Sequence, residues 1–83
     1  MIVDPDARID PYAPLPPFRQ LVEILTARIE RGDWPPERPI TAEARLAEEY
    51  GIARNTVRRA IAVLTERGLL FVVPKRGTFV AKR

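Results

Sequence analysis

Residues 51–64, GIARNTVRRAIAVL, constrain the fold of this chain more than any other stretch. Four apolar residues in it recur at the i, i+3, i+4, i+7 spacing of one buried helical face: Val57, Ala60, Ile61 and Leu64. The other side of the same helix is basic, with one amide and one small residue: Arg54, Asn55, Arg58, Arg59 and Ala62. The pattern therefore predicts a tight glycine turn followed by a helix that packs on one face only.

The basic face lowers the stability of this helix when nothing is bound to it. Arg54 and Arg58 are like charges at i and i+4, which costs roughly 0.2–0.5 kcal/mol, and the helix dipole disfavours cations in the first turns. An external anion would turn both penalties into attractions. Because arginine and asparagine make bidentate contacts with guanine and adenine edges, we interpret this helix as a DNA recognition helix. The alternative is an ordinary solvated face.

Two further helices are expected before this one. Pro16 and Pro17 suit the start of a helix, a stripe of apolar residues follows at helical spacing, and Gly32 can cap its end. Residues 38–40 can form a short strand. Thr41 is the best N-cap for the next helix, with Glu43 in its first turn. That helix and the basic helix, joined by the turn at Gly51, predict a helix-turn-helix.

A β-hairpin is expected after the third helix, which ends at Gly68. Residues 69–73 and 78–80 are rich in strand-forming side chains and flank a turn over residues 74–77. In the first run, the alternation of Leu69, Phe71 and Val73 predicts the core-facing side. Lys75 and Arg76 place two cations at the tip, which can follow a phosphate strand or enter a minor groove, or can form an ordinary solvated loop. A hairpin in this position is a wing.

Together these elements predict a mainly α fold with a small β-hairpin (α+β), a three-helix winged helix-turn-helix over residues 16–83. Residues 1–15 lack any usable hydrophobic period and predict a flexible N-terminal arm. The predicted DNA-binding motifs lie in the half of the chain that carries the positive charge. Residues 1–37 carry a net charge of −3 and residues 38–83 a net charge of +6, and a polyanionic partner is the simplest physical reason for such a division.

The composition excludes several functions. The 83 residues contain no cysteine, histidine or serine, so Ser-His and Cys-His catalysis is ruled out, and a thiolate metal site is impossible. We therefore predict that the chain is not an enzyme and needs no metal or cofactor. No apolar run approaches a membrane span, and no signal peptide pattern opens the chain. The expected location is the cytoplasm, without a membrane partner.

Motifs over about residues 15–80 resemble the DNA-binding domain of GntR-type bacterial transcription regulators, whose fold is a winged helix-turn-helix. The resemblance is carried by LAEEYGI at residues 46–52, RNTVRRA at 54–60, GLL at 68–70 and GTFV at 77–80. It implies that Arg54 and Arg58 read base edges in the major groove, and that Asn55 occupies a variable contact position. It also implies that Thr56 supports a phosphate contact, and that Gly77 and Thr78 lie near the minor groove.

The sequence departs from the family pattern at several positions. Ala42 and Ala53 stand where serines usually cap the second and third helices, and each lost cap is worth about 1 kcal/mol. Ala44 stands where many relatives carry an arginine to DNA, and Arg45 follows it about 100° around the helix. Lys75 replaces the first wing glycine and Glu37 a turn glycine. We expect the backbone at Lys75 to avoid the positive φ that glycine tolerates.

Two hypotheses follow. The first is a sequence-specific regulator of transcription, expected to be a repressor, that binds double-stranded DNA at a pseudo-palindromic operator. We expect a monomer or weak homodimer in solution that associates on DNA. The second is a winged-helix protein-interaction module whose arginines pair with an acidic partner. Under the first hypothesis, the recognition helix, the helix before it and the wing supply ten DNA-binding candidates: Arg45, Arg54, Asn55, Thr56, Arg58, Arg59, Lys75, Arg76, Gly77 and Thr78.

Overall fold

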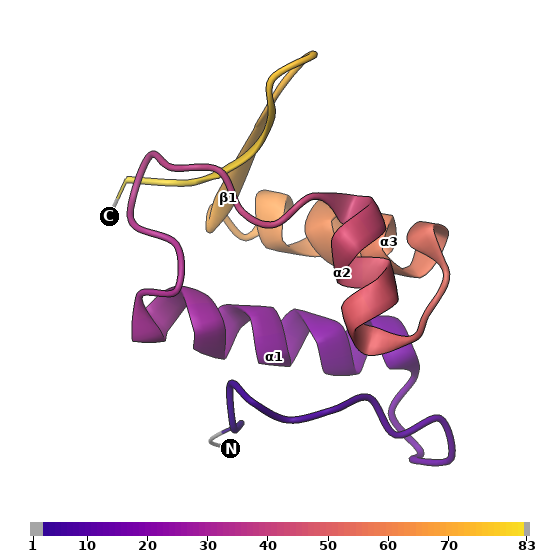
Figure 1. The fold of residues 1–83 in the computed structure, drawn as a ribbon. Helices are drawn as coiled ribbons and strands as arrows, with labels where there is room; N and C mark the ends of the chain where they lie inside the picture. Colours follow the sequence, from indigo (N-terminus) through magenta and orange to yellow (C-terminus); the bar gives the residue numbers. More distant parts are fainter. Residues whose placement is uncertain (1–2, 83) are drawn as a thin grey trace.

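The computed structural model describes residues 3–82 and confirms the predicted winged helix-turn-helix (Figure 1). Residues 1, 2 and 83, at the ends of the predicted arm and domain, lie outside the described residues. Three helices precede a two-stranded hairpin, in the order α1 (Pro17–Arg31), α2 (Glu43–Tyr50), α3 (Arg54–Glu66), β1 (Leu70–Val73) and β2 (Gly77–Val80). Helix α1 lies beneath α2 and α3, and the hairpin projects from the other side of these helices.

A single apolar core joins all these elements. Its fully buried side chains come from each helix and both strands, and the largest are Leu21, Leu25, Leu46, Leu64, Leu70, Val22, Val57 and Val80. Trp34, in the turn after α1, is also buried at the edge of this core. Among residues 3–82 no polar or charged residue is buried. The fold is therefore held by non-directional apolar packing, with its polar contacts at the surface.

The helix ends follow the glycine and proline signals, but the predicted cap of α2 is wrong. Gly32 and Gly51 end α1 and α2 in the left-handed conformation. The N-cap of α2 is Ala42, which makes no side-chain cap bond. Thr41 cannot serve there because it lies one residue earlier, and its Oγ1 instead accepts a 3.3 Å hydrogen bond from Trp34 Nε1. Helix α3 likewise starts after Ala53 without a side-chain cap.

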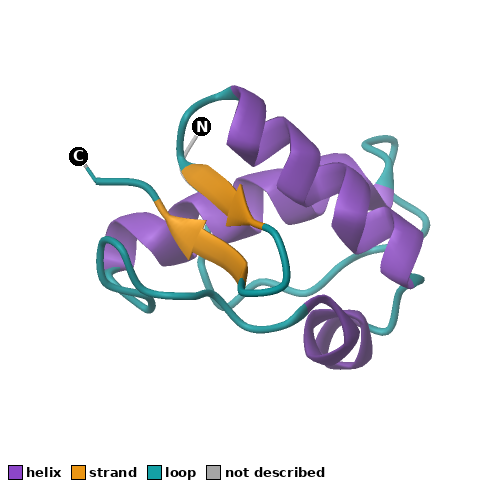
Figure 2. Ribbon diagram, turned by 90° about the horizontal axis from the view of Figure 1, so that it is seen from above, coloured by secondary structure: helices purple, strands orange, loops and turns teal. Residues whose placement is uncertain are grey.

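Figure 2 shows the two antiparallel strands of the hairpin from above. The predicted core-facing side is confirmed only in part: Leu69 packs against the core, but Phe71 does not line it. Leu70 pairs with Val80, and both are buried, whereas Phe71 is 39% exposed and stacks on its partner Phe79 with ring centroids 5.6 Å apart. The strand begins only at Leu70, because the Leu69 amide still donates to the Leu64 carbonyl at the end of α3. Val72, on the same face as Leu70, is 55% exposed, so only the base of the hairpin joins the core and the alternation of the strand does not continue as burial.

Residues 37–40 run along β2 and extend the wing at its base. The amides of Glu37 and Ile40 donate to the carbonyls of Val80 and Thr78 at 2.8 and 2.9 Å. Only an isolated bridge between Pro39 and Phe79 forms here, so the predicted strand over residues 38–40 is a single bridge. The α1–α2 connection thereby holds the wing against the helices.

Two turns place a charged residue in the left-handed region. Glu37 and Lys75 both have φ of 65°, so the expectation that Lys75 avoids positive φ is wrong. Each residue follows a proline, and each turn is closed by a backbone hydrogen bond, from Arg38 to Pro35 and from Arg76 to Val73. Proline in the second position and positive φ in the third are typical of a type II turn. The closed turn imposes this conformation on a residue other than glycine.

Replacing Glu37 with glycine should therefore stabilise the domain. A left-handed L-residue costs roughly 1–2 kcal/mol, and the greater freedom of glycine in the unfolded chain cancels part of that gain, so we expect the free energy of unfolding to rise by about 0.5–1 kcal/mol. Urea unfolding followed by circular dichroism measures it. The matched control is Glu48→Gly inside α2, which should lower the free energy of unfolding by about 1 kcal/mol. Equal losses in both variants would contradict the prediction.

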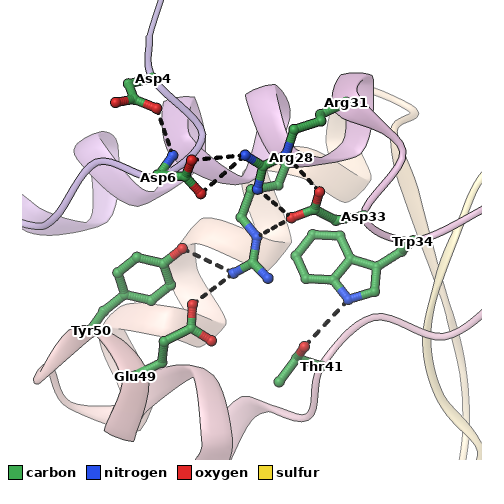
Figure 3. Close-up of polar contacts among 9 residues, drawn as sticks. All are labelled: Asp4, Asp6, Arg28, Arg31, Asp33, Trp34, Thr41, Glu49 and Tyr50. Carbon is green, nitrogen blue, oxygen red and sulfur yellow. Dashed lines mark hydrogen bonds and ion pairs between the residues drawn. The ribbon is translucent and has the colours of Figure 1, made fainter.

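A surface polar cluster ties the N-terminal segment, α1 and α2 together (Figure 3). Arg28 donates from Nε to Asp33 and from one terminal nitrogen to Glu49 and Tyr50, at 2.8, 2.8 and 3.0 Å, and its guanidinium lies 4.4 Å from the Trp34 ring centre. Arg31 binds Asp33 through Nε and one terminal nitrogen. The other terminal nitrogen of Arg31 binds both carboxylate oxygens of Asp6 in the N-terminal segment, each at 3.0 Å.

Asp33 should make the stability of the domain dependent on pH. Hydrogen bonds from Arg31 and then Arg28 hold the pKa of its carboxyl well below the usual range. Its stabilising contribution is therefore complete above the unfolded pKa of about 3.9 and declines as the pH falls below it. At pH 7, Asp33→Asn should lower the free energy of unfolding by about 1–2 kcal/mol, and this deficit should shrink at pH 3.

Urea unfolding of both proteins at pH 7 and pH 3 tests this dependence. Glu30→Gln is the matched control, because Glu30 is an exposed acid of α1 with no ion pair among residues 3–82. It should change stability by less than about 0.5 kcal/mol at either pH. A deficit of Asp33→Asn that is as large at pH 3 as at pH 7 would show that the loss does not come from the ionised carboxylate.

Candidate nucleic-acid interface

The outer face of α3 carries a row of exposed polar side chains. Its buried face consists of Val57, Ala60, Ile61 and Leu64, as the spacing predicted. On the other side Asn55 is exposed, and the side chains of Arg54 and Arg58 are 63% and 60% exposed. These groups can therefore reach a ligand without any rearrangement of the core.

Glu43, in the first turn of α2, faces the two arginines of α3. Its Oε1 lies 3.2 Å from a terminal nitrogen of Arg58 and 3.9 Å from one of Arg54, and its Oε2 lies 3.5 Å from Arg58 Nε. The carboxylate is 28% exposed and sits where the dipole of α2 favours a negative charge. One acid thus offsets the repulsion between Arg54 and Arg58 in the chain itself, a contact that the sequence reasoning did not include.

Arg59 has a different environment. Its guanidinium carbon lies 3.9 Å from the ring centre of Phe18 at the start of α1, and Arg19 lies 5.1 Å from the same ring. Cation–π contacts of this kind contribute about 0.5–1 kcal/mol at exposed sites. They hold Arg59 on the α1 side of α3, next to the row formed by Arg54 and Arg58.

A groove separates the wing from the first turns of α2 and α3. Glu43, Ala44 and Arg54 line one side of it, and Lys75 and Arg76 belong to the wing side, with Gly77 and Thr78. The wing tip residues 74–77 are exposed, whereas Thr78 is half-buried. Cations therefore border this groove from both the helices and the wing.

The ten predicted residues fall into neighbouring parts of the surface. The groove brings together Arg54, Lys75, Arg76, Gly77 and Thr78. A shallow depression on α3 contains Asn55, Arg58 and Arg59 together with Ala62. Thr56 is half-buried at the start of α3. Arg45 does not line the groove; it is exposed on α2 beside Glu48 and Glu49, in a depression that shares Thr41 and Ala42 with the groove.

Sequence reasoning missed Glu43 and Phe18 as parts of this surface. Glu43 lies in the first turn of α2, as predicted. Phe18 belongs to the apolar stripe that was expected to be buried along α1, but it is only half-buried. Their contacts with arginines depend on how α1 and α2 pack against α3, which helical periodicity does not specify. The only available signals were an acid at the start of α2 and an aromatic residue at the start of α1.

Other kinds of site have no support in the described chain. Among residues 3–82, no group of three acidic, cysteine or histidine side chains could hold a metal ion. None of the helices in the same residues is long and apolar enough to cross a membrane. The exposed arginines of α3 and the cations of the wing make this polar surface the candidate interface.

Residues 17–80 match the family described as bacterial regulatory proteins, gntR family. The chain is 40% identical over 74 residues to the HTH-type transcriptional repressor NagR of Bacillus subtilis. This match covers 89% of this chain and 30% of that protein. It is 36% identical over 69 residues to the histidine utilization repressor of Pseudomonas putida, covering 83% of this chain and 28% of that protein. The chain thus spans less than a third of the length of these relatives.

Solved structures show the same fold. AraR(DBD) in complex with operator ORR3 superimposes with a TM-score of 0.79 at 34% identity, covering 92% of both chains. YtrA from Sulfolobus acidocaldarius, a GntR-family transcription factor, gives 0.80 at 26% identity and covers 92% of this chain and 80% of that one. The family is one of regulatory proteins, in agreement with the prediction that the chain is not an enzyme. With its fold and its motifs in agreement, the chain belongs to the gntR family of bacterial regulatory proteins.

Proposed function

We propose that this chain is a sequence-specific DNA-binding module of a transcriptional repressor. One observation carries the proposal: Arg54, Asn55 and Arg58 are exposed along one face of a helix whose opposite face is fixed in the core. Arginine and asparagine are the side chains that read guanine and adenine bidentately. The operator complex of AraR(DBD) and the repressors among the relatives support this role over a protein-interaction module.

In this proposal each element has a separate task. Helix α3 enters the major groove, and α2 braces it from behind, as in other helix-turn-helix proteins. Arg54 and Arg58 contact base edges, while Thr56 and Arg59 contact the adjoining phosphates. Lys75 and Arg76 at the wing tip follow the flanking backbone or the minor groove, where their contribution is mainly electrostatic.

The partner in this proposal is double-stranded DNA with a pseudo-palindromic site. Two-fold operators require two copies of a reader, with half-sites related by the same symmetry. We therefore propose that two copies bind adjacent half-sites and associate only weakly without DNA. Because transcription in a bacterium takes place in the cytoplasm, we place the chain there.

Selection from randomised duplex DNA tests this function. Enriched duplexes are measured again at several salt concentrations against a random duplex. An enriched, roughly palindromic motif bound about 10³-fold or more tightly than random DNA is the expected result. If the protein retains duplexes without enriching a motif, and its affinity falls steeply with salt, it binds the DNA backbone only. If the protein retains no DNA, the alternative of an acidic protein partner is favoured.

A further inference from the structure

Glu43 places a carboxylate on the surface that is proposed to contact DNA, where a negative charge opposes binding. Its contacts with Arg58, at 3.2 and 3.5 Å, are longer than the 2.7–2.9 Å of strong charge-assisted pairs. The Arg58 side chain is also 60% exposed, and exposed pairs of this kind contribute little to stability. The ion pair with Arg58 therefore adds little to the stability that Glu43 provides as the acid in the first turn of α2.

The contact leaves one edge of Arg58 available. Glu43 engages Nε and one terminal nitrogen, which form the side edge of the guanidinium. The remaining donors lie on the end edge, formed by the two terminal nitrogens, and two adjacent donors suffice for the bidentate contact with guanine O6 and N7. Glu43 thus restricts Arg58 to an orientation in which it can still read a base edge.

The same carboxylate reduces the attraction of this surface for phosphates. It lies within 4 Å of both Arg54 and Arg58, so it offsets part of the positive charge that any duplex would meet. Sequence-independent binding depends on such charge, whereas a base-edge contact also depends on the orientation of the guanidinium. The net effect is a lower affinity for random DNA and a larger difference between sequences.

From these contacts we infer that Glu43 is a specificity-determining residue that positions Arg58, and with it Arg54, for base reading. The inference rests on the proposed DNA-binding function. It assigns to α2 a role beyond bracing α3, because the acid that orients the reading arginines belongs to α2.

Substitution of Glu43 by glutamine tests the inference, with Glu48→Gln as the matched control. Glu48 is an exposed acid of the same helix with no ion pair among residues 3–82, so both variants lose one negative charge. Affinities for the selected duplex, its single-base variants and a random duplex are measured by fluorescence anisotropy. In Glu43→Gln, the ratio of selected to random affinity should fall about tenfold, as expected for one weakened bidentate contact. In Glu48→Gln, the ratio should stay within about twofold of wild type.

A second variant separates orientation from charge. Glu43→Asp keeps the negative charge but is one methylene shorter, so it should leave affinity for random DNA unchanged and weaken binding of the selected duplex only. In both Glu43 variants, discrimination should be lost at the base pairs where Arg58→Ala loses it. The Asp variant also replaces the Gln variant if the latter does not fold by circular dichroism.

The outcomes distinguish this role from the function on which it rests. A wild-type chain that prefers no duplex would contradict the proposed function and the inference with it. A wild-type preference that persists at full strength in both Glu43 variants would contradict only the role of Glu43. Discrimination lost evenly across the site would likewise exclude positioning of Arg58.

Discussion

The Arg58→Ala variant should bind the duplex preferred by the wild-type chain about 5- to 150-fold more weakly, which corresponds to roughly 1–3 kcal/mol. The loss should concentrate at one base pair, where the variant no longer discriminates between bases. Alanine removes the donors of the guanidinium and leaves Glu43 without its nearer partner, so that a carboxylate faces the DNA. Anisotropy titrations with the preferred duplex and its single-base variants measure both effects.

Lys75→Ala is the control for this prediction. Lys75 is exposed at the wing tip, where a phosphate contact carries no sequence information. Its loss should weaken binding to all duplexes similarly and reduce the salt slope by about one. If Arg58→Ala bound all duplexes as the wild-type chain does, α3 would not be the reading element. If the two variants gave the same uniform loss, Arg58 would contact phosphate only.

Truncation of Leu64 should have the largest effect on stability. Its side chain is fully buried within the core that α1, α3 and the hairpin share. Leucine-to-alanine changes in such positions cost about 2–5 kcal/mol through lost burial and the cavity left behind. A domain of this size has little surplus, because native proteins are stable by only about 5–15 kcal/mol. Leu64→Ala should therefore lower the midpoint of thermal unfolding by about 10–30 °C.

Val72→Ala provides the comparison for Leu64. Val72 is 55% exposed on the wing, so its truncation should change the free energy of unfolding by less than about 0.5 kcal/mol. Thermal unfolding without DNA, followed by circular dichroism, separates the two variants. Similar midpoints for both would mean that the C-terminal part of α3 does not pack against the hairpin as described here.

Local signals were sufficient to predict the helices. Gly32 and Gly51 end α1 and α2 because left-handed caps favour glycine, and the apolar spacing identified the buried face of α3. The hairpin was predicted as an element, but its core face was predicted only in part. Alternation along a strand does not show where burial ends, and here only Leu70 and Val80 at the base of the hairpin are fully buried.

Contacts between elements explain what could not be predicted at the site. The Thr41 hydroxyl was expected to cap α2, but the position of Trp34 gives it another partner. Lys75 was expected to avoid positive φ, yet the closed turn at the wing tip imposes it. Glu43 meets Arg54 and Arg58 only because of the distance and angle between α2 and α3. Contacts of this kind depend on how the elements pack in three dimensions, and the periodicity of the sequence does not predict them.

The wholly apolar core has a consequence for how this domain can change. Its contacts have no direction, so cores of this kind tolerate exchanges of similar volume, such as leucine for methionine. The hydrogen bonds of Arg28 and Arg31 at the surface are directional, and they link the N-terminal segment, α1 and α2. Substitutions in the core and at the surface are therefore limited by different requirements. Core residues must keep their total volume, whereas the surface arginines and their partners must keep the geometry of their hydrogen bonds. A lineage could replace much of the core while the reading helix keeps its orientation.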